Sequence, residues 1–437
     1  MRGTITDSKS RITELDGLRG LAILMMLYFH AVESAPLPRY FSAVGKLTWT
    51  AIDLFFVLSG FLIGGILLDA RNSPNYFKTF YIRRAYRILP LYIVTVAAFW
   101  VLFYLTDLKS GNLVFRWLLS NPPPWYSFAS MTQNIAMTLR GVISPGWLGV
   151  TWSLAVEEQF YLTLPFVIRY VGPRRLPYVL AALIVAAPVI RTFLRLFYGN
   201  GDLGAYILLP CRADALLLGV SAALLMRNNK ARQFLETHKR LLYATLLLLA
   251  CGMLWMAMKP AGLRTGFNAE QARGIAQSTA ATSSNMWIWL RLGLRTAMAS
   301  LNYTWLDLFY LCVLLIAINH RSSLLSRVLR NRLLVGFGII SYAAYVFHQP
   351  MLGVVFGIFR GYLPRVTSVP DTGLTALALG LTVGLACFSW WYFEKPLLKR
   401  GHTYRYERAD DLPAPTPHKP LATELSGEQT HSIRPLT

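Results

Sequence analysis

Long apolar runs, separated by short polar segments, dominate the pattern along this chain. A membrane-spanning helix needs about 20 mostly apolar residues, because its backbone polar groups must bond within the helix where no water is present. The pattern predicts an all-α polytopic membrane protein with about ten transmembrane helices, at 15–34, 47–69, 88–106, 147–168, 176–196, 203–226, 240–258, 303–319, 333–358 and 374–393. Two of these spans, 147–168 and 203–226, contain charged residues, and a further segment, 126–143, could lie at the membrane interface.

Composition and charge support a lipid environment and suggest an orientation. The 437 residues are 54% hydrophobic and 15% charged, and the net charge is +22. Of the 43 lysines and arginines, 27 fall in the alternate polar segments that include the chain termini, which predicts that both termini are cytoplasmic. The basic excess is then explained by topology and by attraction to anionic membrane lipid, and no nucleic-acid partner is expected. The expected location is a cell membrane, which the chain crosses several times.

Three regions are expected along the chain: a cytoplasmic segment over 1–14, a transmembrane domain over 15–400 and a disordered cytoplasmic tail over 401–437. The tail is rich in proline, serine and threonine and has few large apolar residues. The four cysteines fall inside predicted spans without C-x-x-C spacing, so we expect packing residues and no metal site.

Candidate chemistry begins in the first span, where Arg19 and His30 are eleven residues apart. That spacing returns the two side chains to within roughly 20° of one helix face, about 16 Å apart along the axis. Ionisable residues inside a membrane are costly and usually face a bundle interior or a wet cavity. A snorkelling arginine and a core histidine are the alternative interpretation.

The second span places Asp53 at a depth similar to that of His30. Gly60 and Gly64 follow on the same stripe, with the small-xxx-small spacing that favours close helix packing. We interpret the glycines as packing residues and Asp53 as a candidate site residue.

A basic cluster precedes the third span. Arg84 and Arg87, at i and i+3, would present two guanidinium groups on one helix face, which suits phosphate oxygens. Basic clusters at cytoplasmic boundaries also follow from topology alone, and the pattern does not decide between the two interpretations.

The fourth span carries two adjacent carboxylates. Ser153, Glu157 and Tyr161 share one face, and Glu158 is displaced from it by about 100°. One glutamate is expected to serve the site and the other to pair with a cation such as Arg19 or Arg212.

The ninth span places Ser341, Tyr345 and His348 on one stripe, with His348 about as deep as His30. Two histidines at equal depth, near Asp53 and a glutamate, predict a polar chamber that opens toward the outer side.

Several of these motifs together resemble acyltransferase family 3, which comprises integral-membrane O-acyltransferases that modify O-antigen, peptidoglycan, capsule and other glycans. The similarity covers about residues 20–400 and includes Glu394. It rests on Arg19-x10-His30, "DLFFVLSGFLI" at 53–63, "RRAYRILP" at 83–90, "WSLAVEEQFYL" at 152–162, "SYAAYVFHQP" at 341–350 and "FEKP" at 393–396.

The resemblance implies cytoplasmic acyl-CoA as co-substrate, with acetyl as the expected group, no permanently bound cofactor, and an acceptor hydroxyl on a glycan or other envelope molecule. It also implies a catalytic role for His30, an essential Arg19 and an important pair in Arg84 and Arg87. Imidazole is suited to serve as a base for a hydroxyl near neutral pH. The residues expected at the site are, for catalysis, His30, Glu157, Asp53 and His348 and, for substrate binding, Arg19, Arg84, Arg87, Glu158, Trp152, Ser153 and Tyr345.

Two alternatives stay open from the sequence. Asp53 or Glu157 could orient or charge the imidazole of His30, and a covalent acyl intermediate on a side chain is compatible with the same residues. A secondary transporter or carrier of a lipid-linked glycan would also place charges in a midplane cavity. Oligomeric state is not encoded in any pattern we find.

Overall fold

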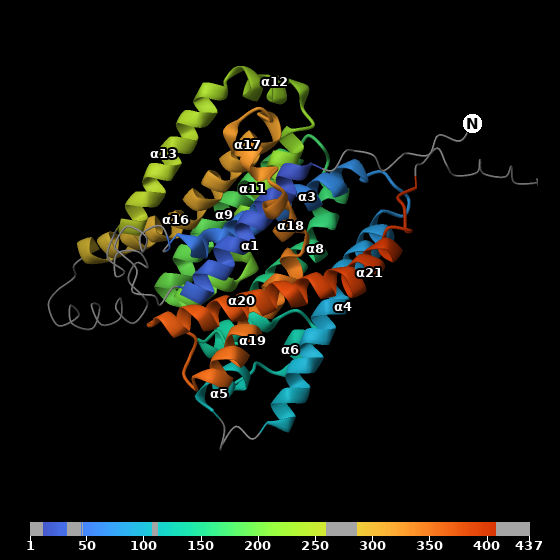
Figure 1. The fold of residues 1–437 in the computed structure, drawn as a ribbon. Coiled ribbons are helices and arrows are strands. Elements are labelled where there is room, and N and C mark those ends of the chain that lie inside the picture. The colour runs from blue at the N-terminus through green and yellow to red at the C-terminus, as the bar shows by residue number, and fades with distance from the viewer. Residues whose placement is uncertain (1–11, 33–44, 46, 107–111, 259–285, 408–437) are drawn as a thin grey trace, which may run out of the picture.

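The computed structural model describes residues 12–32, 45, 47–106, 112–258 and 286–407, and this part of the chain is a helical bundle without strands (Figure 1). An all-α fold is what the apolar pattern predicts. The longer helices are α1 (Thr13–Val32), α3 (Ala51–Asp69), α4 (Tyr76–Leu105), α8 (Trp152–Tyr170), α9 (Leu176–Phe197), α11 (Leu209–Leu225), α13 (Lys239–Met258), α16 (Met286–Asn319), α19 (Ser341–Phe359) and α20 (Val369–Ser389).

In the described part of the chain, eight helical segments are long and apolar enough to cross a membrane. They confirm a multi-pass membrane protein. Helices α1 and α8, which correspond to the predicted spans 15–34 and 147–168, are of similar length but carry several charged residues. The predicted total of ten spans and the cytoplasmic placement of the termini stay predictions.

Several predicted spans differ in detail from the observed helices. Helix α4 begins at Tyr76, so the basic cluster expected before a span at 88 lies within the helix. Two predicted spans are each divided into two helices: 203–226 into α10 (Gly201–Ile207) and α11, and 333–358 into α18 (Arg332–Ile339) and α19. The segment 126–143 forms two short helices, α6 (Trp125–Ala129) and α7 (Gln133–Arg140).

The shorter described elements connect and cover this bundle. Helix α12 lies between α11 and α13 along the chain (Figure 1), and one π-helical turn joins α20 to α21. These elements are η1 (Thr48–Thr50), α5 (Leu113–Leu119), η2 (Gly149–Thr151), α12 (Asn229–Thr237), α17 (Leu324–Leu329), η3 (Trp390–Glu394) and α21 (Lys395–Gly401).

Helix α3 packs closely against α11 through glycine. A Cβ atom added at Gly60 would lie 1.8 Å from the backbone oxygen of Leu216, and one at Gly219 would lie 2.1 Å from that of Val57. Only a residue without a side chain permits this approach. The interpretation of Gly60 as a packing residue is confirmed, and α3 is held in place beside the candidate site.

The end of the described chain stays packed on the bundle. Asn75 donates a hydrogen bond to the Arg405 carbonyl (2.9 Å), and Arg83 donates one to that of Tyr404 (2.7 Å). Packing therefore continues past the tail boundary expected at residue 401. The rest of that predicted tail, 408–437, lies outside the described residues.

Candidate active site

A small cavity of about 130 Å³ lies between α1, α3, α4, α8 and α19. It includes six of the residues predicted for the site. The lining consists of Arg19, Ile52, Phe55, Leu58, Ser59, Arg84, Arg87, Ile88, Ser153, Leu154, Glu157, Tyr161, Ser341, Tyr342 and Tyr345.

Helix α8 supplies the acidic wall of this cavity. Ser153, Glu157 and Tyr161 follow at i, i+4 and i+8 and face the same space, as their spacing predicts. The Tyr161 hydroxyl donates to Oε2 of Glu157 (3.1 Å) and also contacts the hydroxyl of Ser59. Glu158 does not line the cavity, and its Oε1 is buried without a hydrogen-bond partner. Of the two glutamates, Glu157 is therefore the one placed to act in the cavity.

Three guanidinium groups give the cavity a positive character. Arg84 and Arg87 come from one face of α4, and Arg19 comes from α1. Arg19 lies 3.3 Å from the carboxylate of Asp16, whereas Nε of Arg84 is buried without a hydrogen-bond partner. Like charges enclosed together in a medium of low dielectric repel strongly, so this arrangement favours an anionic ligand.

At one end of the cavity two hydroxyl groups meet. The Tyr345 hydroxyl donates to the Val150 carbonyl (2.8 Å) and lies 2.7 Å from Oγ of Ser153. The Tyr345 ring lies 5.7 Å from the ring of His348 between centroids, so Tyr345 separates the cavity from the histidines.

His30 and His348 form a pair. Nε2 of His348 lies 3.2 Å from Nδ1 of His30, and the ring centroids are 4.8 Å apart. Nδ1 of His348 contacts the Tyr345 carbonyl (2.6 Å), and Nδ1 of His30 contacts that of Met26 (3.2 Å). The prediction that two histidines at equal depth lie together is confirmed.

These contacts fix the tautomers of the neutral rings. A carbonyl oxygen only accepts hydrogen bonds, so Nδ1 carries the proton in both rings. His348 then accepts from His30 through Nε2, and the second nitrogen of His30 has no hydrogen-bond partner among the described residues. An imidazole with that nitrogen free is in the form needed to take a proton from a hydroxyl group.

Two predicted site residues lie elsewhere. Asp53 forms an ion pair with Arg212 and does not line the cavity, and Trp152 is buried against Tyr206 with ring centroids 4.8 Å apart. The expectation that Asp53 or Glu157 contacts the imidazole of His30 is wrong for the observed geometry, since His348 occupies that position. Sequence spacing gave each residue's helix face but not its partner on another helix.

A second, much larger cavity of about 1300 Å³ adjoins the first. Arg19 and Arg87 line both cavities and therefore mark the junction between them. Basic residues from several helices line the larger space, which we call the vestibule: Arg19, Arg87, Arg227, Arg232, Arg321, Lys395, Lys399 and His402. Asp16, Asp69 and Glu236 are its acidic residues.

Most of the vestibule residues were missed as site residues in the sequence. Their basic character was visible, but the positive-inside pattern already accounted for it. Glu394, noted from the motif resemblance, is buried, accepts a hydrogen bond from Ser389 (3.1 Å) and lines neither cavity. Among the described residues no cluster of His, Cys, Asp or Glu suited to a metal ion is found.

These features define the class: a multi-pass membrane protein whose helices enclose a large basic vestibule, a small polar cavity and a histidine pair. A family model described as an acyltransferase domain matches residues 12–393. The chain belongs to this acyltransferase family, as the motif resemblance implies.

Three relatives illustrate the similarity. Peptidoglycan O-acetyltransferase OatA of Listeria monocytogenes is 26% identical over 416 residues, covering 92% of this chain and 58% of that protein. The putative peptidoglycan O-acetyltransferase YrhL of Bacillus subtilis is 27% identical (89% and 55%), and O-acetyltransferase OatA of Staphylococcus aureus is 26% identical (89% and 57%). The chain thus spans little more than half the length of these relatives. No solved structure matches it.

Proposed function

We propose that this protein transfers an acetyl group from acetyl-CoA to a hydroxyl group of peptidoglycan or another cell-envelope glycan, in the bacterial inner membrane. The observation that carries the proposal is the basic vestibule that joins the small cavity, with the histidine pair beyond Tyr345 at the end of that cavity. The names of the relatives support the acetyl group and the glycan acceptor.

The vestibule suits the nucleotide end of the donor. Coenzyme A carries several phosphate charges, and guanidinium groups bind phosphate oxygens with charge-assisted hydrogen bonds. The volume of about 1300 Å³ exceeds the usual range for drug-sized ligands, which extends to roughly 1,000 Å³. Arg19 and Arg87 at the junction would hold the chain that links the phosphates to the thioester.

The small cavity suits a short acyl group. A space of about 130 Å³ accommodates an acetyl thioester with few additional atoms. Arg84, whose Nε has no hydrogen-bond partner in the described part of the chain, would stabilise the oxyanion developing on the thioester carbonyl. Enclosure strengthens such interactions because little water competes for them.

His30 is the proposed base. Its free ring nitrogen would take the proton of the acceptor hydroxyl while the hydroxyl oxygen forms a bond to the thioester carbonyl carbon. The carbon–sulfur bond then breaks, the CoA thiolate leaves, and the proton passes to the thiolate. His348 would orient His30 through the hydrogen bond between them and share the positive charge that forms.

The test is acyl transfer by purified protein in lipid nanodiscs, with labelled acetyl-CoA and a soluble glycan acceptor. We expect labelled acceptor and free CoA in equal amounts, and loss of both products in His30→Ala. His238→Ala is a matched control, since His238 is exposed directly after the end of α12. Movement of the glycan across a liposome membrane without CoA consumption would instead support the carrier alternative and contradict this proposal.

A further inference from the structure

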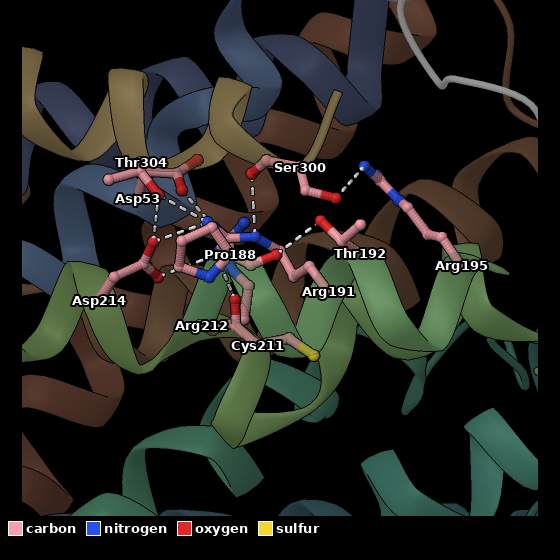
Figure 2. A network of polar contacts seen from close by, with 10 residues as sticks. All are labelled: Asp53, Pro188, Arg191, Thr192, Arg195, Cys211, Arg212, Asp214, Ser300 and Thr304. Carbon is pink, nitrogen blue, oxygen red and sulfur yellow. Dashed lines mark hydrogen bonds and ion pairs between the residues drawn. The ribbon is translucent and has the colours of Figure 1, made fainter. Parts of the chain in front are cut away.

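A second polar cluster lies buried on the other side of α3, between α3, α9, α11 and α16 (Figure 2). Its central feature is Arg191, whose side chain is fully buried. Arg191 forms a two-pronged ion pair with Asp214, with nitrogen–oxygen distances of 3.0 and 2.8 Å, and donates to the Ser300 carbonyl (3.0 Å). Thr304 bridges the pair, accepting from Arg191 (2.6 Å) and donating to Asp214 (2.7 Å). This half of the cluster is fully paired.

The other half of the cluster is not fully paired. Arg212 binds one carboxylate oxygen of Asp53, and its guanidinium group lies 4.6 Å from the ring centroid of Tyr303. Asp307 lies close to Asp53 and is 1% exposed. Among the described residues neither oxygen of Asp307 has a donor, and the second oxygen of Asp53 lacks one as well. Nε and one terminal nitrogen of Arg212 are also buried without a partner, so these nitrogens do not supply the donor that the carboxylates lack.

The charges in the core of the cluster do not balance. Two guanidinium groups, Arg191 and Arg212, face three carboxylates, Asp53, Asp214 and Asp307. Arg195 and Asp202 pair with each other at the edge of the cluster (3.1 Å), so the excess of one negative charge in the core is unchanged. An uncompensated charge buried away from water is very costly, whereas two neighbouring carboxyl groups that share one proton are both satisfied.

We infer that this cluster is a proton-binding site, in which one proton is held between the carboxyl groups of Asp53 and Asp307. The proton removes the excess negative charge and supplies the missing donor. A metal cation fits less well, because the guanidinium group of Arg212 already adjoins the same carboxylate. The titratable and charged groups around the site are Arg191 from α9, Tyr206 from α10, Arg212 and Asp214 from α11, and Tyr303 and Tyr310 from α16.

The proton-binding site bears on the candidate active site because helix α3 contributes residues to both. Asp53 lies on the face of α3 toward α11 and α16, whereas Phe55 and Ser59 line the small cavity. The proton lets α16 pack against α3 at the level of two carboxyl groups that would otherwise repel each other. It therefore holds the cavity wall in place without taking part in acyl transfer.

Infrared spectroscopy of the purified full-length protein tests the inference. Aspartate labelled with ¹³C at its side-chain carboxyl distinguishes aspartic acid from the buried glutamic acids. We expect a carbonyl band of a protonated carboxylic acid that moves on aspartate labelling and is lost in Asp307→Asn. If the wild-type protein shows no aspartate-sensitive band of this kind, or if the band persists in Asp307→Asn, the inference is wrong.

A matched pair of variants gives a second readout. Asp307→Asn replaces a protonated carboxyl with a neutral group of the same shape, so the purified yield and melting temperature should stay at the wild-type level. Asp214→Asn makes the same chemical change but removes the partner of Arg191, so both quantities should fall. Equal destabilisation by the two substitutions would overturn the inference. A melting temperature of the wild-type protein that changes with the sodium concentration would overturn it as well, in favour of a bound metal cation.

Discussion

The two buried polar regions on either side of α3 handle charge in different ways. Three guanidinium groups, those of Arg19, Arg84 and Arg87, line the small cavity with one carboxylate, that of Glu157, and Nε of Arg84 has no partner in the described part of the chain. In the cluster around Arg191, ion pairs, hydrogen bonds and the proposed shared proton match the charges (Figure 2). An excess of buried positive charge is costly on its own, so the cavity region is built for a ligand that supplies negative charge. The matched cluster is built to hold helices together.

The contrast predicts that the largest loss of activity comes from the histidine pair. His30→Ala should lower the rate of acyl transfer by about 10²- to 10⁴-fold at saturating donor, because a positioned base is removed. Donor affinity should stay the same, since the vestibule is untouched. Single-turnover kinetics with labelled acetyl-CoA measures the rate, and a rate within twofold of the wild type would exclude His30 as the base.

In the matched cluster, the main effect should be on stability. Arg191→Leu leaves the carboxylate of Asp214 buried without its cation, which costs about 3–5 kcal/mol. Thermal or denaturant unfolding in nanodiscs should show this loss, while the Michaelis constant for the donor in the surviving folded protein stays unchanged. A weaker donor affinity at normal stability would mean that the two regions are not separate.

In the cavity region, substitutions of the arginines should impair activity without lowering the stability of the protein. Arg87→Ala removes a charge-assisted contact to the donor worth about 1.5–3 kcal/mol, so the Michaelis constant for acetyl-CoA should rise roughly 10- to 100-fold, whereas Arg84→Ala removes the proposed oxyanion donor and should lower turnover instead. The melting temperature should stay level or rise, because repulsion among the three arginines is relieved. Arg232→Ala, at the exposed rim of the vestibule, is the control and should have a small effect that salt removes.

The smallest effect is expected at the contact between the cavity and the histidines. Tyr345→Phe removes the hydrogen bonds to Ser153 and Val150 and should lower the free energy of unfolding by about 0.5–1.5 kcal/mol. Turnover should change by less than tenfold, since the aromatic ring stays in place. Tyr178→Phe, at an exposed position on α9, should leave both quantities unchanged.

Sequence reasoning predicted helix faces well and helix partners poorly. The periodicity of α8 correctly predicted that Ser153, Glu157 and Tyr161 face one cavity. The equal depth of His30 and His348 in their spans correctly predicted that the two rings lie together. Asp53 was assigned to the same chamber for the same reason of depth, but its side chain points toward Arg212. Depth along a helix is readable from a chain, whereas the neighbour at that depth depends on how helices pack around one another.

Asp307 shows a different kind of gap. It was not singled out, although it is a charged residue inside an apolar run, which is the signal that identified Asp53. The vestibule residues gave a signal that two causes explain equally, since topology and donor binding both favour basic residues at one membrane face. The breaks between α10 and α11 and between α18 and α19 interrupt runs whose overall hydropathy is continuous.

The contact of Tyr345 with Ser153 and Val150 has a consequence for the membrane as an electrical barrier. A cavity that extends into a bilayer from one side shortens the distance that an ion must cross, and a basic vestibule would concentrate anions at its mouth. The two hydroxyl groups close the inner end of that path with a hydrogen bond, behind which the His348 ring is buried. Under the proposed function, such a seal would let an acyl group approach the histidines while the bilayer keeps its resistance to ions.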